Sequence, residues 1–479
     1  MFDAACLAQI CRCTNLRQLR LVECALLALE EDVSSVEPLR SLTNLTALDL
    51  GGNQLGADAA SAICSIFGER TAPNACCLTS LELWGSDADD NTALAIMALT
   101  SLKTLNLSWT SITDEGMQAV VLGLGRSHLT ALDMSNAAKL EMGSCAACLD
   151  GAPLLTSLSL AGLQLDADDL SAALRLPELT SLNLHAARLE GGARRRDALR
   201  QVVFAQKLQV LRLDHLKGSA PWSVGRSPMT PEELNQDIAK LLELPQLEAG
   251  RHRGVALVEL RASECVFFKE HASFAKLWLQ LSIVSLQRLE MSGCPPLRVV
   301  FQQVASMPQR GGWARLERID AAMTKADDTL PTDLGRLGAP LQHIDLSGNP
   351  DITEHHLLLM TSLQPTLHTI VLRDMPRLTA RSVGIIFEDR LFENLRKVDV
   401  DGTAIGEADR AKIGANVIAA KAAKRAEAML ARFRDATPDE TAAASSVTRY
   451  DAATMRSLRA SPFAQLPPRP LPVLPGILR

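Results

Sequence analysis

The sequence has no excess of positive charge. Its 479 residues include 49 basic and 55 acidic side chains, which gives a formal net charge of −6. Binding to nucleic acid or to an anionic membrane surface depends on an attraction that needs a positive excess. We therefore expect neither nucleic acid nor a membrane among the partners of this protein.

A long apolar run and an export signal are also missing. The longest apolar stretch, around residues 274–289, is interrupted by Lys276, Gln280 and Gln287, so it is too short to cross a bilayer. The N-terminal residues MFDAACLAQICRC lack the basic start and clean apolar segment of a secretory signal. We expect a cytoplasmic protein with reduced thiols, since its 11 cysteines are an odd number. A mitochondrial location stays open, because three arginines fall within the first 20 residues.

Motifs for catalysis or cofactor binding are absent as well. The sequence contains no G-x-x-x-x-G-K-[ST] phosphate loop, no G-x-S-x-G and no H-E-x-x-H. His355 and His356 are adjacent, so on a helix they point about 100° apart and cannot bind one ion together. Cys145 and Cys148 have the spacing of half a metal or redox site, but without a second pair we interpret them as buried structural thiols. We predict no enzymatic activity, cofactor, metal or small-molecule ligand.

One pattern fills most of the chain. The spacing L-x-x-L-x-L, with other apolar residues as substitutes, recurs fourteen times at intervals of 24 to 33 residues, apart from one interval of 49. Such regular self-similarity predicts a stack of structural repeats. The pattern starts at Leu16, Leu45, Leu78, Leu102, Leu129, Leu155, Leu179, Leu208, Leu257, Leu286, Leu316, Leu341, Leu367 and Leu395.

A small residue follows the apolar triplet in most repeats. Three residues past the last apolar position, nine of the fourteen repeats have Asn, Cys, Ser or Thr. Such a side chain can bond buried backbone groups where the chain turns, and these groups cannot be left unsatisfied. A helix is expected to return on the other side, with Thr113, Asp168, Thr353 or Thr379 as an N-cap. The nine residues are Cys24, Asn53, Ser86, Thr110, Cys265, Cys294, Thr324, Asn349 and Thr403.

The complete pattern, L-x-x-L-x-L-x-x-N/C-x-L, resembles the leucine-rich repeat family over about 85% of the chain. The helical segments 112–124, 165–174 and 352–363 are similar to the ribonuclease-inhibitor-like branch of that family. The resemblance implies an α/β solenoid, a horseshoe of about 14 repeats with parallel strands on the concave face and helices on the convex face.

The cysteines near the N-terminus allow two interpretations. Cys6, Cys11, Cys13 and Cys24 have a spacing that resembles the disulfide-bonded caps of secreted leucine-rich repeat proteins. Alternatively, Cys24 occupies the small-residue position of the first repeat, and this is the interpretation we favour.

The domain organisation follows from the repeats. We expect a capping helix at 1–15, repeats over 16–406, a second capping helix at 407–434 and a Pro-rich extended tail at 435–479. An insertion at about 214–256 is either a tolerated surface loop or a partner contact anchored by Trp222. In the tail, Arg469, Pro472 and Pro475 fit R-x-x-P-x-x-P, which resembles a ligand of SH3 domains. The tail is alternatively an arm that packs within an assembly.

Protein-binding residues are expected among the outward-facing strand positions. The residue between the second and third apolar positions is acidic in seven repeats and basic in three, which favours a partner with a basic surface. The alternative is that L-D-L and L-N-L are ordinary in such repeats without any ligand. Trp84 lies two residues after Glu82, at the next outward-facing position. Its side chain is either exposed as a binding residue or folded over its neighbours, and the sequence leaves both alternatives open. The predicted set is Asp49, Glu82, Trp84, Asp133, His185, Glu290, Asp320, Asp345, Arg373 and Asp399.

We interpret the chain as a non-enzymatic scaffold that mediates protein–protein interaction within a larger complex. Analogy with other all-repeat proteins points to a ciliary or cytoskeletal complex. One alternative is a soluble one-to-one inhibitor or regulator of a basic protein, ribonuclease-inhibitor-like or GTPase-directed. The other is a substrate adaptor of a ubiquitin ligase, which is disfavoured because we find no F-box.

Overall fold

The structure is a computed structural model that describes part of every repeat. The described residues are 4–24, 33–53, 55–69, 78–124, 128–190, 205, 207–218, 257–265, 285–294, 315–326, 330, 334, 339–360, 363, 365–382 and 394–415. The chain divides into two compact units, Met1–Val417 and Ile418–Arg479, and every described residue lies in the first unit.

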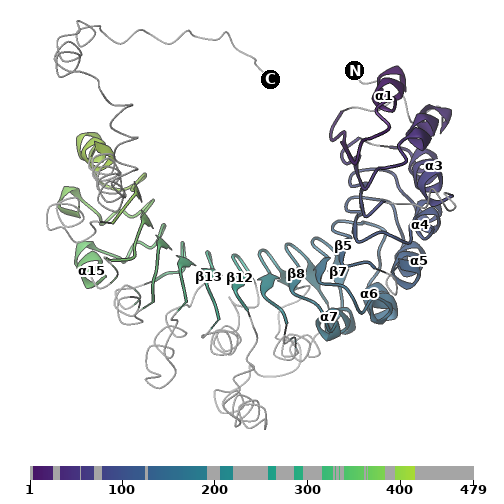
Figure 1. Ribbon diagram of the computed structural model, residues 1–479. Helices are drawn as coiled ribbons and strands as arrows, with labels where there is room; N and C mark the ends of the chain where they lie inside the picture. The colour runs from purple at the N-terminus through teal and green to yellow at the C-terminus, as the bar shows by residue number, and fades with distance from the viewer. Residues whose placement is uncertain are drawn as a thin grey trace, which may run out of the picture. The chain divides into compact units, whose positions relative to one another are not determined.

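A parallel sheet of fourteen three-residue strands organises the described part of the first unit (Figure 1). The order of the strands in the sheet follows the chain, so each repeat adds one strand beside the previous one. All fourteen coincide with predicted L-x-x-L-x-L segments. The strands are β1 Gln18–Arg20, β2 Ala47–Asp49, β3 Ser80–Glu82, β4 Thr104–Asn106, β5 Ala131–Asp133, β6 Ser157–Ser159, β8 Ser181–Asn183, β10 Val210–Arg212, β12 Glu259–Arg261, β13 Arg288–Glu290, β14 Arg318–Asp320, β15 His343–Asp345, β16 Thr369–Val371 and β17 Lys397–Asp399.

The leucines of the pattern form one continuous core. Of the fourteen leucines that start the pattern, thirteen are at most 2% exposed, and Leu16 packs against the core as a partly buried residue. The middle residue of each strand points inward, while its two neighbours point outward from the sheet. A repeat alone would leave its leucines exposed to water, so stability comes from stacking neighbours.

Where a small polar residue follows the strand, its side chain bonds the backbone, as predicted. The hydroxyls of Ser86 and Thr110 each donate to the carbonyl three residues earlier, at 2.6 Å. Asn349, with no exposed surface, donates to the carbonyls of Ala321 and Leu346 and accepts from the N–H groups of Thr324 and Ala326. These side chains satisfy backbone groups that the turn leaves without a strand partner.

A left-handed residue closes every one of the fourteen turns. The third residue after each strand has φ between +51° and +72°. In thirteen repeats its N–H donates to a carbonyl in the next repeat, so the backbone ladder continues beyond the strands. Glycine occupies this position in six repeats and a residue with a side chain in eight. The positions are Glu23, Gly52, Gly85, Trp109, Asn136, Gly162, Ala186, His215, Glu264, Gly293, Met323, Gly348, Asp374 and Gly402.

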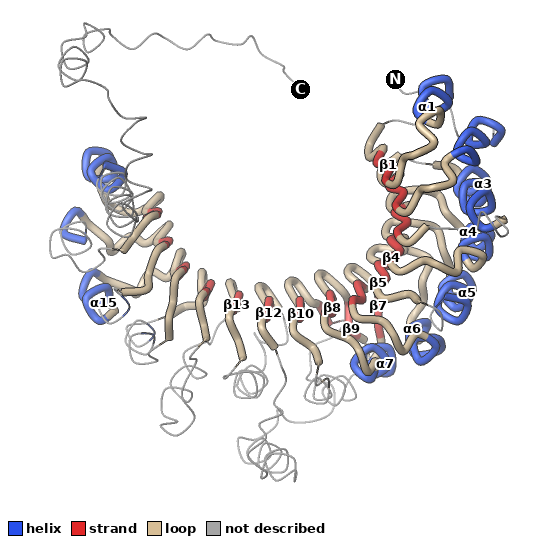
Figure 2. The backbone as a smooth tube through the Cα atoms, viewed as in Figure 1, coloured by secondary structure: helices blue, strands red, loops and turns tan. Residues whose placement is uncertain are grey.

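Helices lie on the side of the unit opposite the strands (Figure 2). The predicted α/β arrangement is confirmed. Among the predicted caps, Thr353 caps its helix in a capping box, whereas Asp168 does not: Asp166 takes that place, pairing with Asp169 at the third position of the helix. The described helices are α1 Ala4–Ile10, η1 Val33–Ser41, α3 Ala57–Gly68, α4 Asp90–Ile96, α5 Asp114–Leu124, α6 Ser144–Cys148, η2 Leu149–Gly151, α7 Ala167–Arg175 and α15 Glu354–Leu359.

A second, three-stranded parallel sheet joins neighbouring repeats behind the first. It consists of β7 Gln164–Leu165, β9 Arg188–Leu189 and β11 Lys217–Gly218. The sequence pattern did not predict this sheet, because two-residue strands leave no detectable period. Its last strand falls in the segment assigned to the insertion, so residues 214–218 follow the regular repeat.

The predicted capping segments and appendages are described only in part. Helix α1 lies within the N-terminal segment 1–15, and residues 407–415 are helical at the start of the C-terminal one. The remainder of the insertion with Trp222, and the tail with Arg469, Pro472 and Pro475, lie outside the described residues.

The cysteines have the structural roles that we favoured. Cys11, Cys13 and Cys24 are free thiols, so the alternative disulfide-bonded cap is not formed. Cys265 and Cys294 fill the buried turn position. Cys145 and Cys148 are buried by α6 and its surroundings, and burial raises the pKa of the Cys148 thiol to about 12. Such thiols stay protonated at neutral pH and are poor nucleophiles.

Replacement of Asn349 by Ala should destabilise the protein by about 3 kcal/mol, because it leaves several buried backbone groups without a partner. Asn44, an exposed residue whose amide donates to the carbonyl of Thr14 at 3.2 Å, offers the matched control. Asn44→Ala should cost less than about 0.5 kcal/mol. Urea unfolding of both variants gives the comparison, and equal losses would contradict the assigned role of Asn349.

Candidate protein-binding face

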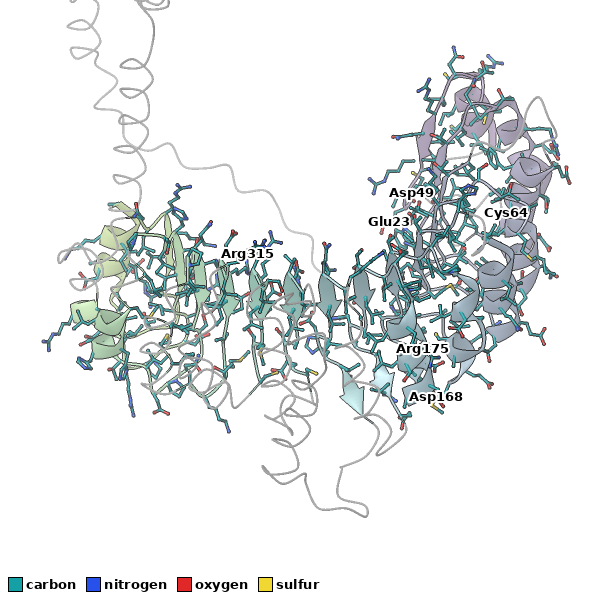
Figure 3. All side chains as sticks on the ribbon, turned by 60° about the horizontal axis from the view of Figure 1, so that its bottom comes forward. Glu23, Asp49, Cys64, Asp168, Arg175 and Arg315 are labelled. Atoms are coloured by element: carbon teal, nitrogen blue, oxygen red, sulfur yellow. The ribbon has the colours of Figure 1, made fainter. Side chains whose placement is uncertain are left out.

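The side chains at the first and third positions of the fourteen strands form one continuous surface, here called the strand face. Strand pairing is in register throughout, so the third residues stand side by side: Arg20 beside Asp49, Asp49 beside Glu82, and so on to Asp399. The column predicted from the sequence therefore exists as a physical row. Figure 3 shows Asp49 and Glu23 on this side of the unit and Cys64 among the helices.

Several acidic and amide residues of the row also stabilise the turn that follows them. An Oδ1 atom of Asp133 accepts the N–H of Ser135 at 2.8 Å, and Asp345 accepts the N–H of Ser347 at 2.9 Å. Asp49 bonds Gly51 in the same way, at 3.2 Å. This local role explains why L-D-L and L-N-L occur in such repeats without a ligand. One oxygen of each carboxylate remains for other contacts.

The first part of the row, on β2 to β5, is negatively charged. Asp49 pairs with Arg20 at 3.1 Å, but Glu82 and Asp133 have no ion-pair partner among the described residues. Burial raises the pKa of Glu82, and the negative charges of Asp49 and Asp133 raise it further. A hydrogen bond from Asn106 and the positive charge of Arg20 lower it but do not outweigh these causes. The structure thus aligns three predicted residues in one row and leaves two of them without an ion pair among the described residues.

The later part of the strand face, on β10 to β15, is occupied by an ion-pair network that joins first-position and third-position residues. The carboxylate of Glu259 is 10% exposed and lies 2.6 Å from Arg261, 3.4 Å from Arg288 and 3.9 Å from Arg212. Glu290 in turn lies 3.4 Å from Arg261. These charges neutralise each other within the sheet, so this part of the face has little net attraction to offer a partner.

The network continues to Asp320, which lies 2.9 Å from Arg318 and 3.1 Å from the imidazole of His343. Burial alone would raise the pKa of Asp320, but the hydrogen bonds from His343 and Arg318 outweigh it and lower the pKa. For Glu290, by contrast, burial prevails over its arginine partners and raises the pKa.

Two further predicted residues satisfy each other. The guanidinium of Arg373 is 2.5 Å from the carboxylate of Asp399. The hydrogen bond from Arg373 lowers the pKa of Asp399, and Arg373 is exposed. The predicted Asp345 lies one strand before this pair and bonds its own turn.

Trp84 packs over its neighbours rather than standing in solvent. A Cβ atom built on Gly51 would lie 1.9 Å from the indole nitrogen, and one on Gly52 would lie 2.9 Å from the ring. The indole therefore lies against bare backbone of the preceding repeat and is half-buried. Of the two alternatives, packing is the one observed.

His185 is exposed, and its ring is perpendicular to that of His215 at a centroid distance of 5.4 Å. The sequence pattern missed the most exposed tryptophan of the described chain, Trp109, with an exposed fraction of 64%. Trp109 is the third residue after its strand, whereas Trp84 is the second. The left-handed conformation that directs its side chain is not visible in the spacing of leucines.

The leucine-rich repeat family model matches residues 41–64 and 98–121. These segments are the second and fourth repeats of the fourteen-stranded sheet. The two matched segments are leucine-rich repeats, and the fourteen-stranded unit has the fold of a leucine-rich repeat solenoid. Proteins of this family are typically non-enzymatic interaction modules, and the solenoid is in general a scaffold for protein partners.

Solved leucine-rich repeat structures resemble this solenoid at low sequence identity. The internalin InlF of Listeria monocytogenes is 15% identical, with a TM-score of 0.41, and the match covers 84% of this chain and 89% of that one. A leucine-rich repeat protein of Leptospira interrogans is 18% identical, with a TM-score of 0.42 and coverages of 85% and 95%. The receptor kinase HAESA of Arabidopsis, in complex with a peptide hormone and a co-receptor, is 15% identical, with a TM-score of 0.41 and coverages of 83% and 56%. No curated protein matches the sequence.

Two further properties concern the described part of the leucine-rich repeat solenoid. Its helices are all too short or too polar to cross a membrane. Within the same residues, no group of three or more His, Cys, Asp or Glu side chains is arranged to hold a metal ion.

Glu259→Gln should destabilise the protein by about 2–3 kcal/mol, because it removes the anion between three arginines while leaving their charges in place. Glu178, which pairs with Lys207 on the surface, is the matched control. Glu178→Gln should cost less than about 1 kcal/mol. Both losses are measured by chemical unfolding. A loss for Glu259→Gln no larger than that of the control would contradict the buried network.

Glu82 and Asp320, whose pKa values are shifted in opposite directions, should affect stability with opposite sign. A raised folded pKa means that Glu82 costs stability at pH 7, so Glu82→Gln should be more stable than the wild type there. Asp320, with a lowered pKa, adds stability above its unfolded pKa and loses it as the pH falls, so Asp320→Asn should be less stable by about 1–2 kcal/mol at pH 7. The Glu82 difference should vanish by about pH 4, below the ordinary pKa of a glutamate, whereas the Asp320 difference should largely persist at pH 4 and be lost at lower pH. Thermal unfolding from pH 7 down to about pH 3 measures both, and shifts of the same sign at pH 7 would contradict the assignment.

Proposed function

We propose that the protein is a non-enzymatic scaffold that binds another protein across the strand face, as a structural component of a larger assembly. The observation that carries this proposal is the contrast within the row. Glu82 and Asp133 stand without a basic partner among the described residues, while the acids from β12 onwards are mostly paired within the sheet. A cilium or the cytoskeleton is the setting suggested by analogy with other all-repeat proteins.

A rigid, in-register surface suits this role. The strand ladder and the turn ladder hold the row in place before a partner arrives, so little ordering entropy is lost on binding. The unpaired acids attract a basic partner and speed its approach, an effect that salt weakens. Contacts from Trp222 in the insertion, and from Arg469, Pro472 and Pro475 in the tail, remain part of the proposal as predictions from the sequence.

The same two carboxylates favour a second candidate, a one-to-one regulator of a soluble basic protein. Such a regulator would bind through β2 to β5 alone and need no assembly. The two candidates differ in the size of the complex and in its resistance to salt, because contacts spread over a large assembly include many that salt does not screen.

Sedimentation of the native protein from gently lysed cells, with stepwise increases in salt, separates these candidates. We expect the protein to sediment in a large particle that persists to about 0.5 M salt, where exposed charge pairs are largely screened. Neighbours that sediment with it then identify the assembly. A monomer, or a one-to-one complex that dissociates at moderate salt, would contradict the structural scaffold and support the regulator.

A further inference from the structure

Trp109 has an unusual exposure. It follows β4 in the left-handed region, with φ +57°, and its N–H donates to the carbonyl of Ser135 at 2.8 Å. Its side chain is 64% exposed, the largest exposed fraction of any large apolar residue that the structure describes.

The fold does not require a tryptophan at this position. Six of the fourteen repeats have glycine there, and left-handed φ values are rare and costly for bulky residues. An indole that is mostly in water recovers little of that cost by burial.

The strand that precedes Trp109 has an acidic residue on each side. Strand β4 lies between β3 and β5, and its third residue, Asn106, pairs in register with Glu82 on one side and Asp133 on the other. The backbones of their strands lie about 4.8 Å on either side of β4, the strand that leads into Trp109. Neither has an ion-pair partner among the described residues.

An exposed indole in the turn after a strand that is flanked by two carboxylates without an ion-pair partner offers the chemistry that recognises a guanidinium group. Arginine stacks on indole rings, and its planar fork donates two hydrogen bonds to a carboxylate. We infer that Trp109, Glu82 and Asp133 form a docking point for an arginine side chain in a basic segment of the partner protein. This inference rests on the proposed function of the strand face and specifies which part of the face binds and what it binds.

Substitution of Trp109 by Gly tests the inference on the full-length protein. The probe is a fluorescein-labelled peptide of five Gly-Arg repeats, with a Gly-Glu peptide of equal length as the negative control, and binding is followed by fluorescence anisotropy. Trp109→Gly should weaken binding about fivefold or more, the factor expected for loss of a cation–π contact. Its melting temperature should stay equal or rise, since glycine relieves the left-handed strain. The double variant Glu82→Gln/Asp133→Asn should weaken binding as well.

Met323 provides a matched control. It has the same left-handed conformation, with φ +53°, and is 58% exposed, but the acid on its strand, Asp320, is already bonded to Arg318 and His343. Met323→Gly should leave peptide binding within about twofold of the wild type, since a smaller change is under 0.5 kcal/mol. Wild-type affinity in Trp109→Gly, or an equal loss in Met323→Gly, would overturn the docking point.

The result remains separable from the test of the proposed function. If the wild type sediments in a salt-resistant particle while Trp109→Gly binds the peptide normally, the docking point fails and the scaffold stands. If Trp109→Gly loses peptide affinity while the wild type sediments alone, the docking point stands and the scaffold fails.

Discussion

The hydrogen bond that each turn donates to the next repeat is the constraint on which the solenoid depends. A three-residue strand offers few backbone bonds by itself, so the left-handed residue after the strand extends the ladder by one more N–H. The buried Asn, Ser, Thr or Cys side chain then satisfies the carbonyls beneath it. With both devices present, a short strand can be followed by a sharp turn without leaving buried polar groups unpaired.

The spacing of the leucines predicted the main sheet well because burial of an apolar triplet is a local property of each repeat. All fourteen strands and the role of residues such as Thr324 follow from it. The second sheet and the left-handed turns could not be read in the same way, since a residue such as Glu23 or Met323 adopts that conformation only when the backbone of the next repeat holds it there. A sequence signal for the left-handed turns was nevertheless present, because glycine is the third residue after the strand in six repeats.

The predicted binding row illustrates the same limit. Its alignment was predictable, because parallel strands in register place equivalent residues side by side. The ion pairs of these residues were not predictable from the row alone, because Glu259 and Arg288 occupy the first strand position and so lie outside the row of third residues. Their ion pairs neutralise much of the charge in the later part of the strand face, although the row alone is acidic there. Trp84 and Trp109, two residues with the same side chain, likewise differ in exposure because their turn positions differ by one.

The long interval between β10 and β12 has a consequence for how the chain is held together. Val210 pairs directly with Glu259, and Leu211 with Leu260, as closely as in any repeat without an insertion. The register of the two strands is therefore independent of the length of the chain that connects them, and the insertion lengthens the connection without shifting the repeats. The edges of β10 and β12 carry in themselves the complementary backbone groups and leucines that align one repeat on the next.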